Sequence, residues 1–412
     1  MKKILGLIIS SVLVLSTFIV GCGSGTNSGS SSSSSASQEV IKIGAAVSMT
    51  GPTAKEGKLT KDGYDFWKDW VNSHGGIKMG DKTYKVEMKY YDDESKAETS
   101  AKLMDKLINE DKIKLILGPY GSGPTFAALA VTNRNGALMI NTQGAAKKIY
   151  DQGSKLLIGA LPLAGDYFNG FIKMAQGLQP APKTAVILYA NDSFSTEVAE
   201  GAKASLDKAG INVLMYQAFP QNAKDLTSLL TQVKQKNPDL LLGSGHLEES
   251  ITVTKQMKEL NLNVKAAAFT VGPPTPDFPK ALGKDAEYVF GASLWTPDLN
   301  FKDPLWTDTK GFVTEFKNKF GYVPDYHVAE AVSGCEVMQQ GIQAAASTDP
   351  VKVREAIGKM TTINTLYGAF HFNEKGIVQG IDPAAIQIIG GTQVTVYPQG
   401  KAQYPVPAWD QR

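Results

Sequence analysis

Few residues of this chain have the types and spacing that catalysis or metal binding requires. The four histidines are far apart, and none has a partner at metal-ligand spacing: His74, His246, His327 and His371. The segment 118–123 has closely spaced glycines, but it matches neither phosphate-binding fingerprint, and its serine lacks the spacing of a hydrolase nucleophile turn. With no nucleophile–base pair in the sequence, we expect a protein that is not an enzyme and that uses no metal and no cofactor.

Polar residues that suit ligand binding instead follow short apolar segments. Ser122 follows residues 113–117, Asn141 and Gln143 follow 137–140, and His246 follows 240–242. Short apolar runs of this kind are typical of buried parallel strands, and ligands of open α/β sheets bind at the carboxyl ends of such strands. We expect Ser122 to contact a ligand, and the alternative is that it caps the helix that follows it.

The elements that would position these residues alternate between strand and helix. The first cycle predicts strands at 40–47, 85–91, 113–117 and 137–140, and helices at 56–73, 94–109 and 124–135. A second cycle starts after Gly165, with helices at 168–177, 195–209, 226–236 and 248–260 and strands at 184–189, 212–217, 240–242 and 264–269. A third section has helices at 307–320, 328–346 and 350–359, and then β-rich sequence.

Two β/α cycles predict an α/β protein with two similar lobes. Each lobe would be a mostly parallel sheet flanked by helices. The helical section at 300–360 has no sheet of its own, so we expect it to return and cover the first lobe. Two facing lobes place a single ligand cleft between them.

The N-terminus predicts export. Lys2 and Lys3 precede an apolar run at 4–20 and then Gly21-Cys22, the pattern of a secretory signal. A membrane-spanning helix is the alternative, but ~17 residues is the lower limit for crossing a bilayer. Residues 19–22 resemble the lipobox of bacterial lipoproteins, which implies a signal peptide at 1–21 and a lipidated Cys22 at the mature N-terminus. The Ser/Gly-rich segment 22–38 predicts a disordered linker.

Charge and cysteine content limit the partners. The chain has 42 basic and 40 acidic residues, and loss of Lys2 and Lys3 with the signal leaves 40 of each. Such a balance gives no basic footprint for nucleic acid. Once Cys22 is lipidated, Cys335 has no partner for a disulfide, and we interpret it as a packed helix residue, the alternative being a reactive thiol.

An ordered set of motifs resembles the amino-acid-binding proteins of branched-chain-type ABC importers. The similarity extends from about residue 40 to about 396 and rests on these segments: Gly51-Pro52, Asn72-Ser73-His74-Gly75-Gly76-Ile77, Tyr91-Asp92-Asp93-Glu94-Ser95, Leu117-Gly118-Pro119-Tyr120-Gly121-Ser122, Gly321-Tyr322-Val323-Pro324-Asp325-Tyr326 and Phe372-Asn373-Glu374-Lys375-Gly376. The resemblance implies a two-lobed type I periplasmic-binding-protein fold. It implies lobe 1 at 39–160 plus 295–371 and lobe 2 at 161–294 plus 372–412, joined by crossings at 159–163, 291–295 and 370–373.

The resemblance also implies site residues. Ser122 corresponds to a hydroxyl that holds a ligand carboxylate, and the loop with Asn141, Gln143, Gly144 and Ala145 corresponds to one that supplies backbone and hydroxyl contacts. Phe194 corresponds to an aromatic contact from lobe 2, where residues near His246 and Gly272 close the pocket. Tyr120, Phe194 and Trp295 could each line this pocket or pack in the core.

The sequence departs from the amino-acid-binding pattern of this family at two places, and both bear on which solute is bound. Ala145 replaces the usual threonine, and the acid expected near 271–273 to pair with a ligand ammonium is missing, Asp277 being the nearest. Glu56 could take that role. We expect an amino acid or related small carboxylate, with an aromatic or amide-type solute as the alternative.

The same family implies the setting. The chain would be a monomeric, extracytoplasmic, lipid-anchored receptor that delivers a small solute to ABC importer permease subunits. A ligand sensor of the same fold is the alternative.

Overall fold

The computed structural model describes residues 39–412. The predicted signal peptide at 1–21, the lipidated Cys22 and the linker at 22–38 lie outside the described residues.

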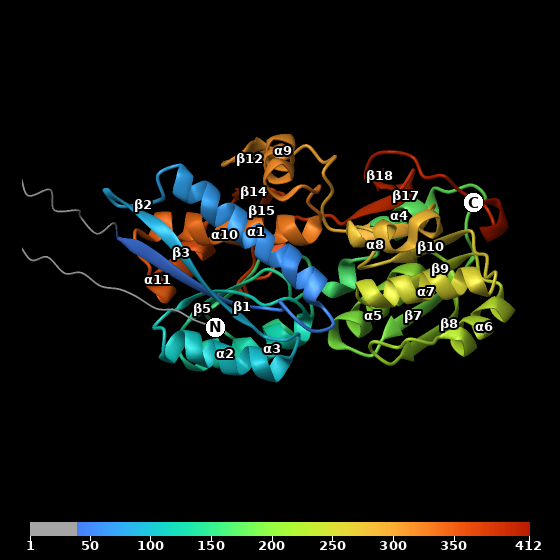
Figure 1. The fold of residues 1–412 in the computed structure, drawn as a ribbon, viewed down its shortest axis with the longest axis horizontal. Coiled ribbons are helices and arrows are strands. Elements are labelled where there is room, and N and C mark those ends of the chain that lie inside the picture. Colours follow the sequence, from blue (N-terminus) through green and yellow to red (C-terminus); the bar gives the residue numbers. More distant parts are fainter. Residues whose placement is uncertain (1–38) are drawn as a thin grey trace, which may run out of the picture. The chain divides into compact units, whose positions relative to one another are not determined.

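The first sheet has the strand order β2-β3-β1-β4-β5-β6 (Figure 1). Its strands are β1 (Val40–Val47), β2 (Ile77–Met79), β3 (Lys82–Asp92), β4 (Leu115–Leu117), β5 (Leu138–Asn141) and β6 (Leu157–Gly159). β1 pairs in parallel with both β3 and β4, and β2 is antiparallel to β3. β4 and β5 are buried along their whole length, as expected of short apolar strands covered on both faces.

Helices cover both faces of this sheet. α2 (Ala97–Asn109) and α3 (Ser122–Arg134) pack together on one face, while α1 (Ala54–Ser73) packs against α10 (Tyr326–Ala345) on the other. The Trp67 ring of α1 is buried and donates from Nε1 to Oε1 of Gln339 in α10, 2.9 Å away. α11 (Pro350–Lys359) packs on α10. The helical section therefore returns to the first sheet, as its sequence predicted.

The second sheet has the order β18-β17-β11-β10-β9-β7-β8. Its strands are β7 (Thr184–Ala190), β8 (Asn212–Phe219), β9 (Leu240–Ser244), β10 (Ala266–Phe269), β11 (Phe290–Ser293), β17 (Ala384–Ile389) and β18 (Thr392–Tyr397). Figure 1 shows the last two strands, in red, beside the green and yellow elements. The helices associated with this sheet are α4 (Asn169–Gln176), α5 (Ser193–Lys208), α6 (Thr227–Lys236), α7 (Leu247–Glu259) and α8 (Asp277–Leu282).

The chain passes between the two sheets three times. The first passage follows β6, and the second follows β11 and leads to β12 (Lys302–Asp303), β13 (Thr307–Asp308) and α9 (Thr309–Phe320). A small sheet then joins β14 (Ile363–Thr365), β15 (Gly368–Phe372) and β16 (Val378–Gln379).

The third passage lies later than the sequence predicted. Oδ1 of Asn373 accepts hydrogen bonds from the backbone N–H groups of Lys375 and Ile377, which folds the chain into a tight turn. Ile377 then forms a bridge with Gly159 of β6. Residues up to Gln379 thus stay with the first sheet, and the crossing lies between β16 and β17 rather than at 370–373.

Two glycines allow α5 to pack closely against the segment that leads into the second sheet. Gly201 of α5 faces Gly165 in the 3₁₀ turn η2 (Ala164–Asp166), directly after the first passage. A Cβ atom at Gly201 would lie 2.0 Å from the carbonyl oxygen of Gly165. The close contact of α5 and η2 therefore depends on the missing side chain.

Candidate ligand-binding site

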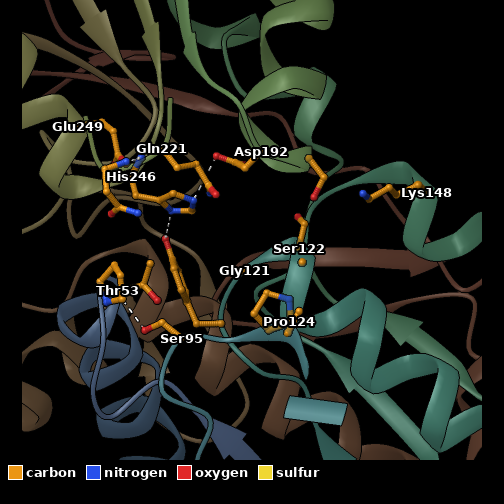
Figure 2. A pocket seen from close by; sticks show the side chains of 16 residues that line it. Thr53, Ser95, Gly121, Ser122, Pro124, Lys148, Asp192, Gln221, His246 and Glu249 are labelled. Carbon is orange, nitrogen blue, oxygen red and sulfur yellow. Dashed lines mark hydrogen bonds and ion pairs between the residues drawn. The ribbon is translucent and has the colours of Figure 1, made fainter. Parts of the chain in front are cut away.

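A cavity of about 350 Å³, here called the outer cavity, lies where the carboxyl ends of strands from both sheets meet (Figure 2). From the first sheet body, its lining comes from the segments after β1, β3, β4 and β5: Pro52, Thr53, Ser95, Ala97, Tyr120, Gly121, Ser122, Gly123, Pro124 and Lys148. From the second, it comes from the segments after β7, β8 and β9: Asp192, Ser193, Gln221, Asn222, His246 and Glu249. The position is the one that open α/β sheets use for ligands.

A second, much smaller space of about 10 Å³, here called the inner cavity, adjoins it. Aromatic and ionisable side chains dominate its lining: Tyr120, Gly121, Gln143, Tyr167, Phe194, His246, Val271, Tyr326, His327 and Glu330. A space of this size holds about one water molecule. Tyr120, Gly121 and His246 line both cavities, so the two form neighbouring parts of one site.

A hydrogen bond between the two sheet bodies separates the cavities. The hydroxyl oxygen of Tyr120, after β4, lies 3.0 Å from Nδ1 of His246, after β9. Nε2 of His246 lies 3.7 Å from Oδ2 of Asp192 (Figure 2). Oδ1 of Asp192 caps α5 by accepting from the backbone N–H groups of Phe194 and Ser195. Burial raises the pKa of Tyr120 well above its ordinary value, so this hydroxyl keeps its proton.

Two buried oxygen atoms at the inner cavity have no hydrogen-bond partner among the described residues. Gln143 is 6% exposed and donates from Nε2 to the carbonyl oxygen of His327, 3.0 Å away, which leaves its Oε1 without a donor. Glu330 of α10 is 1% exposed, and its Oε1 also lacks a donor. Burial, and then the nearby Asp325, raise the pKa of Glu330 well above its ordinary value.

Glu56 lines neither cavity. Its side chain is 1% exposed, and its Oε1 accepts a hydrogen bond of 3.1 Å from the backbone N–H of Leu247, at the start of α7. Glu56 therefore links α1 on the first sheet to a helix N-terminus on the second. Burial raises the pKa of Glu56, and His246 acts in the opposite direction.

The loop after β5 is held by its own polar groups. Oδ1 of Asn141 accepts from the backbone N–H groups of Gln143 and Gly144, and its Nδ2 donates to the Gly144 carbonyl and to the Tyr150 hydroxyl. Asn141, Gly144 and Ala145 line neither cavity. Asn141 shapes the loop from which Gln143 reaches the inner cavity.

Ser122 lines the outer cavity at the first turn of α3. Its Oγ accepts from the backbone N–H of Ala146 at 3.0 Å and makes no helix-capping bond. The capping alternative is thus wrong, and the hydroxyl proton remains free for donation to a ligand oxygen.

Trp295 and Gly272 lie outside both cavities. Trp295 is buried, donates from Nε1 to the carbonyl oxygen of Leu366 at 3.0 Å, and packs edge-on against Phe312. Gly272 has a φ of 120°, and a Cβ atom there would lie 2.7 Å from Cβ of Ser250. Both residues support the fold around the site, and the neighbouring Val271 lines the inner cavity instead.

The structure adds residues that the sequence reasoning missed: Tyr167, Asp192, Tyr326, His327 and Glu330. One signal was available for Glu330. It is an acid in a segment of α10 that is otherwise almost entirely small and apolar, and such a helix is buried all round. A buried acid needs a partner, so its presence there marked a site.

Metal and membrane features are not found in residues 39–412. No group of three or more His, Cys, Asp or Glu side chains there is placed to hold a metal ion. Within the same range no helix combines the length and apolarity needed to cross a bilayer.

Comparisons with known proteins agree on one kind of molecule. The family model described as periplasmic binding protein matches residues 40–387. A Leu/Ile/Val-binding protein homolog from Brucella melitensis is 25% identical over 381 residues, covering 88% of this chain and 92% of the relative. A leucine-, isoleucine-, valine-, threonine- and alanine-binding protein from Pseudomonas aeruginosa is 26% identical over 353 residues, covering 84% and 88%.

Solved structures show the same fold at lower identity. A leucine-binding protein from Thermotoga maritima superposes with a TM-score of 0.76 at 20% identity, covering 86% of this chain and 97% of that one. An ABC transporter solute-binding protein from R. palustris, in complex with benzoate, has a TM-score of 0.74 at 17% identity, covering 90% and 97%.

Proposed function

The chain belongs to the periplasmic binding protein family, as its motifs indicated, and we propose that it is the extracytoplasmic receptor of an ABC importer for an amino acid or related small carboxylate. The observation that carries this proposal is the pair of adjoining cavities at the carboxyl ends of strands from both sheets. The type I periplasmic-binding-protein fold predicted from the sequence is confirmed.

The outer cavity offers groups that suit a carboxylate. The free hydroxyl proton of Ser122 lies at the N-terminus of α3, where the backbone N–H groups and the helix dipole favour an anion. Lys148 lines the same cavity and supplies a positive charge. A small anionic group near Ser122 would meet donors and a cation together.

The mechanism that we propose is closure of two lobes around the solute. The lobes correspond to the two sheets with their helices, lobe 1 being 39–160 plus 295–379 and lobe 2 being 161–294 plus 380–412. Contacts that join them in the present arrangement include Tyr120 with His246, Glu56 with the Leu247 N–H, and the exposed ion pair of Lys55 with Glu248 at 2.8 Å. The backbone N–H of Lys147 also donates to both carboxylate oxygens of Glu197, at 2.7 and 2.8 Å. Opening would break these contacts and give the solute access.

Small-angle scattering tests this mechanism. Protein that is unfolded, dialysed free of co-purified solute and refolded should have a larger radius of gyration than protein saturated with its solute. The solute itself is identified by mass spectrometry of the extract from denatured protein. If no solute is extracted, and no amino acid, aromatic acid or amide changes the radius of gyration, the proposed function is wrong.

An aromatic solute is the second candidate. Tyr120 lines both cavities, and its ring suits an aromatic or amide group that lies in the outer cavity. The same extraction distinguishes the two candidates, because it gives the chemical identity of the bound molecule.

A sensor of the same fold is a separate alternative to a transport role. If the protein is a sensor, cells that lack it should still take up that solute at the normal rate.

We also propose that Cys22 is lipidated and tethers the protein to the outer face of the membrane. The motif at 19–22 after an apolar segment supports this proposal. Cys22→Ala should move the protein from the membrane fraction to the soluble fraction or leave it unprocessed, as measured by fractionation and intact mass. Unchanged processing and membrane association would contradict the proposal.

A further inference from the structure

The inner cavity has an excess of hydrogen-bond acceptors. Gln143 and Glu330 both line it, and the Oε1 atom of each is buried and has no donor among the described residues. A buried acceptor without a donor destabilises the protein, and an unpaired carboxylate does so more strongly. The site is therefore incomplete without a molecule that supplies N–H or O–H groups.

The cavity also lacks a cation. No lysine or arginine is among its lining residues. Its two histidines each lie beside another acid: Nδ1 of His327 is 2.7 Å from Oδ2 of Asp325, and Nε2 of His246 is 3.7 Å from Oδ2 of Asp192. Glu330 thus has no positive partner at the inner cavity.

The walls of the inner cavity suit a positive group. Tyr120, Tyr167, Phe194 and Tyr326 surround it with aromatic rings, whose negative faces attract cations. Tyr167 and Phe194 pack edge to face with ring centroids 5.1 Å apart, so this wall is fixed. A carboxylate beside a set of aromatic rings is a suitable environment for an ammonium group.

We propose that Glu330 and Gln143 form the subsite for a protonated amine of the solute. The amine would donate one N–H to Oε1 of each residue. Burial alone favours the neutral form of Glu330, and a bound ammonium group would favour the ionised form, so that the Glu330 carboxylate balances its charge. This inference rests on the proposed function and narrows its solute to a primary or secondary amine. From the sequence, Glu56 was suggested as the partner of a ligand ammonium group. The present proposal gives this role to Glu330 of α10.

The geometry also sets how the solute lies. The inner cavity admits only the nitrogen and its nearest atoms, since its volume is about 10 Å³. The remainder of the solute extends past Tyr120 and His246 into the outer cavity, toward Ser122 and Lys148. An amino acid satisfies both ends, with its ammonium at Glu330 and its carboxylate at Ser122.

Matched probes test the amine subsite by thermal shift and calorimetry. Each set has an amino acid, its deaminated acid, its decarboxylated amine and its N-trimethyl form: L-leucine, 4-methylpentanoate, isoamylamine and trimethyl-leucine, and the same for L-phenylalanine. The amine-bearing members should raise the melting temperature, and the deaminated acids should not. The trimethyl forms keep the charge but lack N–H donors, so they should bind at least about tenfold more weakly.

Two variants with a matched control locate the effect. Glu330→Gln should weaken amine binding about tenfold or more, and Gln143→Leu should weaken it less, because it removes a neutral acceptor. Glu336→Gln is the control, since Glu336 is a buried acid of the same helix with a partnerless Oε1 that lines neither cavity. It should leave the affinity unchanged. Gln143→Leu also serves if Glu330→Gln fails to fold.

The possible outcomes distinguish a failure of the amine subsite from a failure of the proposed function. Binding and compaction with a solute that has no basic nitrogen would overturn the amine subsite and leave the proposed function intact. Equal binding of trimethyl forms, or equal effects of Glu330→Gln and Glu336→Gln, would also overturn it. If no probe binds, the nitrogen content of the extracted solute decides, and the absence of any solute counts against the proposed function itself.

Discussion

Replacing Glu56 by alanine should weaken solute binding about 10- to 100-fold, although Glu56 lines neither cavity. The variant removes the buried acceptor for the Leu247 N–H at the start of α7. A hydrogen bond of a charged group contributes about 1.5–3 kcal/mol, which corresponds to this range of affinity when the bond exists only in the closed form. Calorimetry with the solute extracted from the purified protein measures the change.

Two further variants separate the acceptor from the charge and from general contact between the lobes. Glu56→Gln keeps an oxygen that can accept from Leu247, so its loss of affinity should be smaller than that of Glu56→Ala. Lys55→Ala removes an ion pair that also joins the two sheet bodies, but its side chains are 47% and 38% exposed, and such pairs contribute little. If Lys55→Ala weakens binding as much as Glu56→Ala, the Glu56 contact has no special role.

Gly201→Ala should destabilise the protein by about 2–3 kcal/mol. The new methyl group would lie 2.0 Å from the carbonyl oxygen of Gly165, and backbone must move to relieve the contact. Alanine in a helix would otherwise stabilise α5 by about 1 kcal/mol, so the sign of the effect tests the close approach. Urea unfolding followed by circular dichroism measures it.

Gly165→Ala is the matched control for this prediction. A Cβ atom at Gly165 would have its nearest neighbours at 3.9 Å, which is ordinary contact. The control should therefore leave the free energy of unfolding nearly unchanged, although it alters the other side of the same interface. A stabilised Gly201→Ala protein would show that α5 and η2 lie farther apart.

The sequence predicted the elements well where the signal is local. The short apolar strands and the helices between them are present, because burial on both faces of a parallel sheet requires such runs. Helix starts were less accurate. α5 and α10 each begin two residues before the predicted positions, since Asp192 and Asp325 accept bonds from the backbone N–H groups of the first turn. These caps are visible in the sequence and set the start of each helix.

Site residues were predictable only in part. Tyr120, Gln143, Phe194 and His246 meet at the inner cavity because each follows a strand, or begins the helix after it, at the same edge of its sheet. Glu330 reaches the same place from α10, almost 200 residues after Gln143, and only the return of this helix to the first sheet brings them together. Trp295 shows a second reason why site residues were hard to predict. An aromatic residue near a crossing between the sheets can pack in the core or line the pocket, and its position in the sequence does not tell which. In the structure it packs in the core.

The hydrogen bond between Tyr120 and His246 would affect how fast a bound solute is released. Both residues line both cavities. A solute whose amine lies in the inner cavity must therefore pass this hydrogen bond in order to leave. The dissociation rate of the solute would then be set by how often the Tyr120–His246 hydrogen bond breaks, and not by the strength of the contacts that the solute makes. Two solutes of different affinity would share one residence time, and they would differ mainly in how fast they are captured.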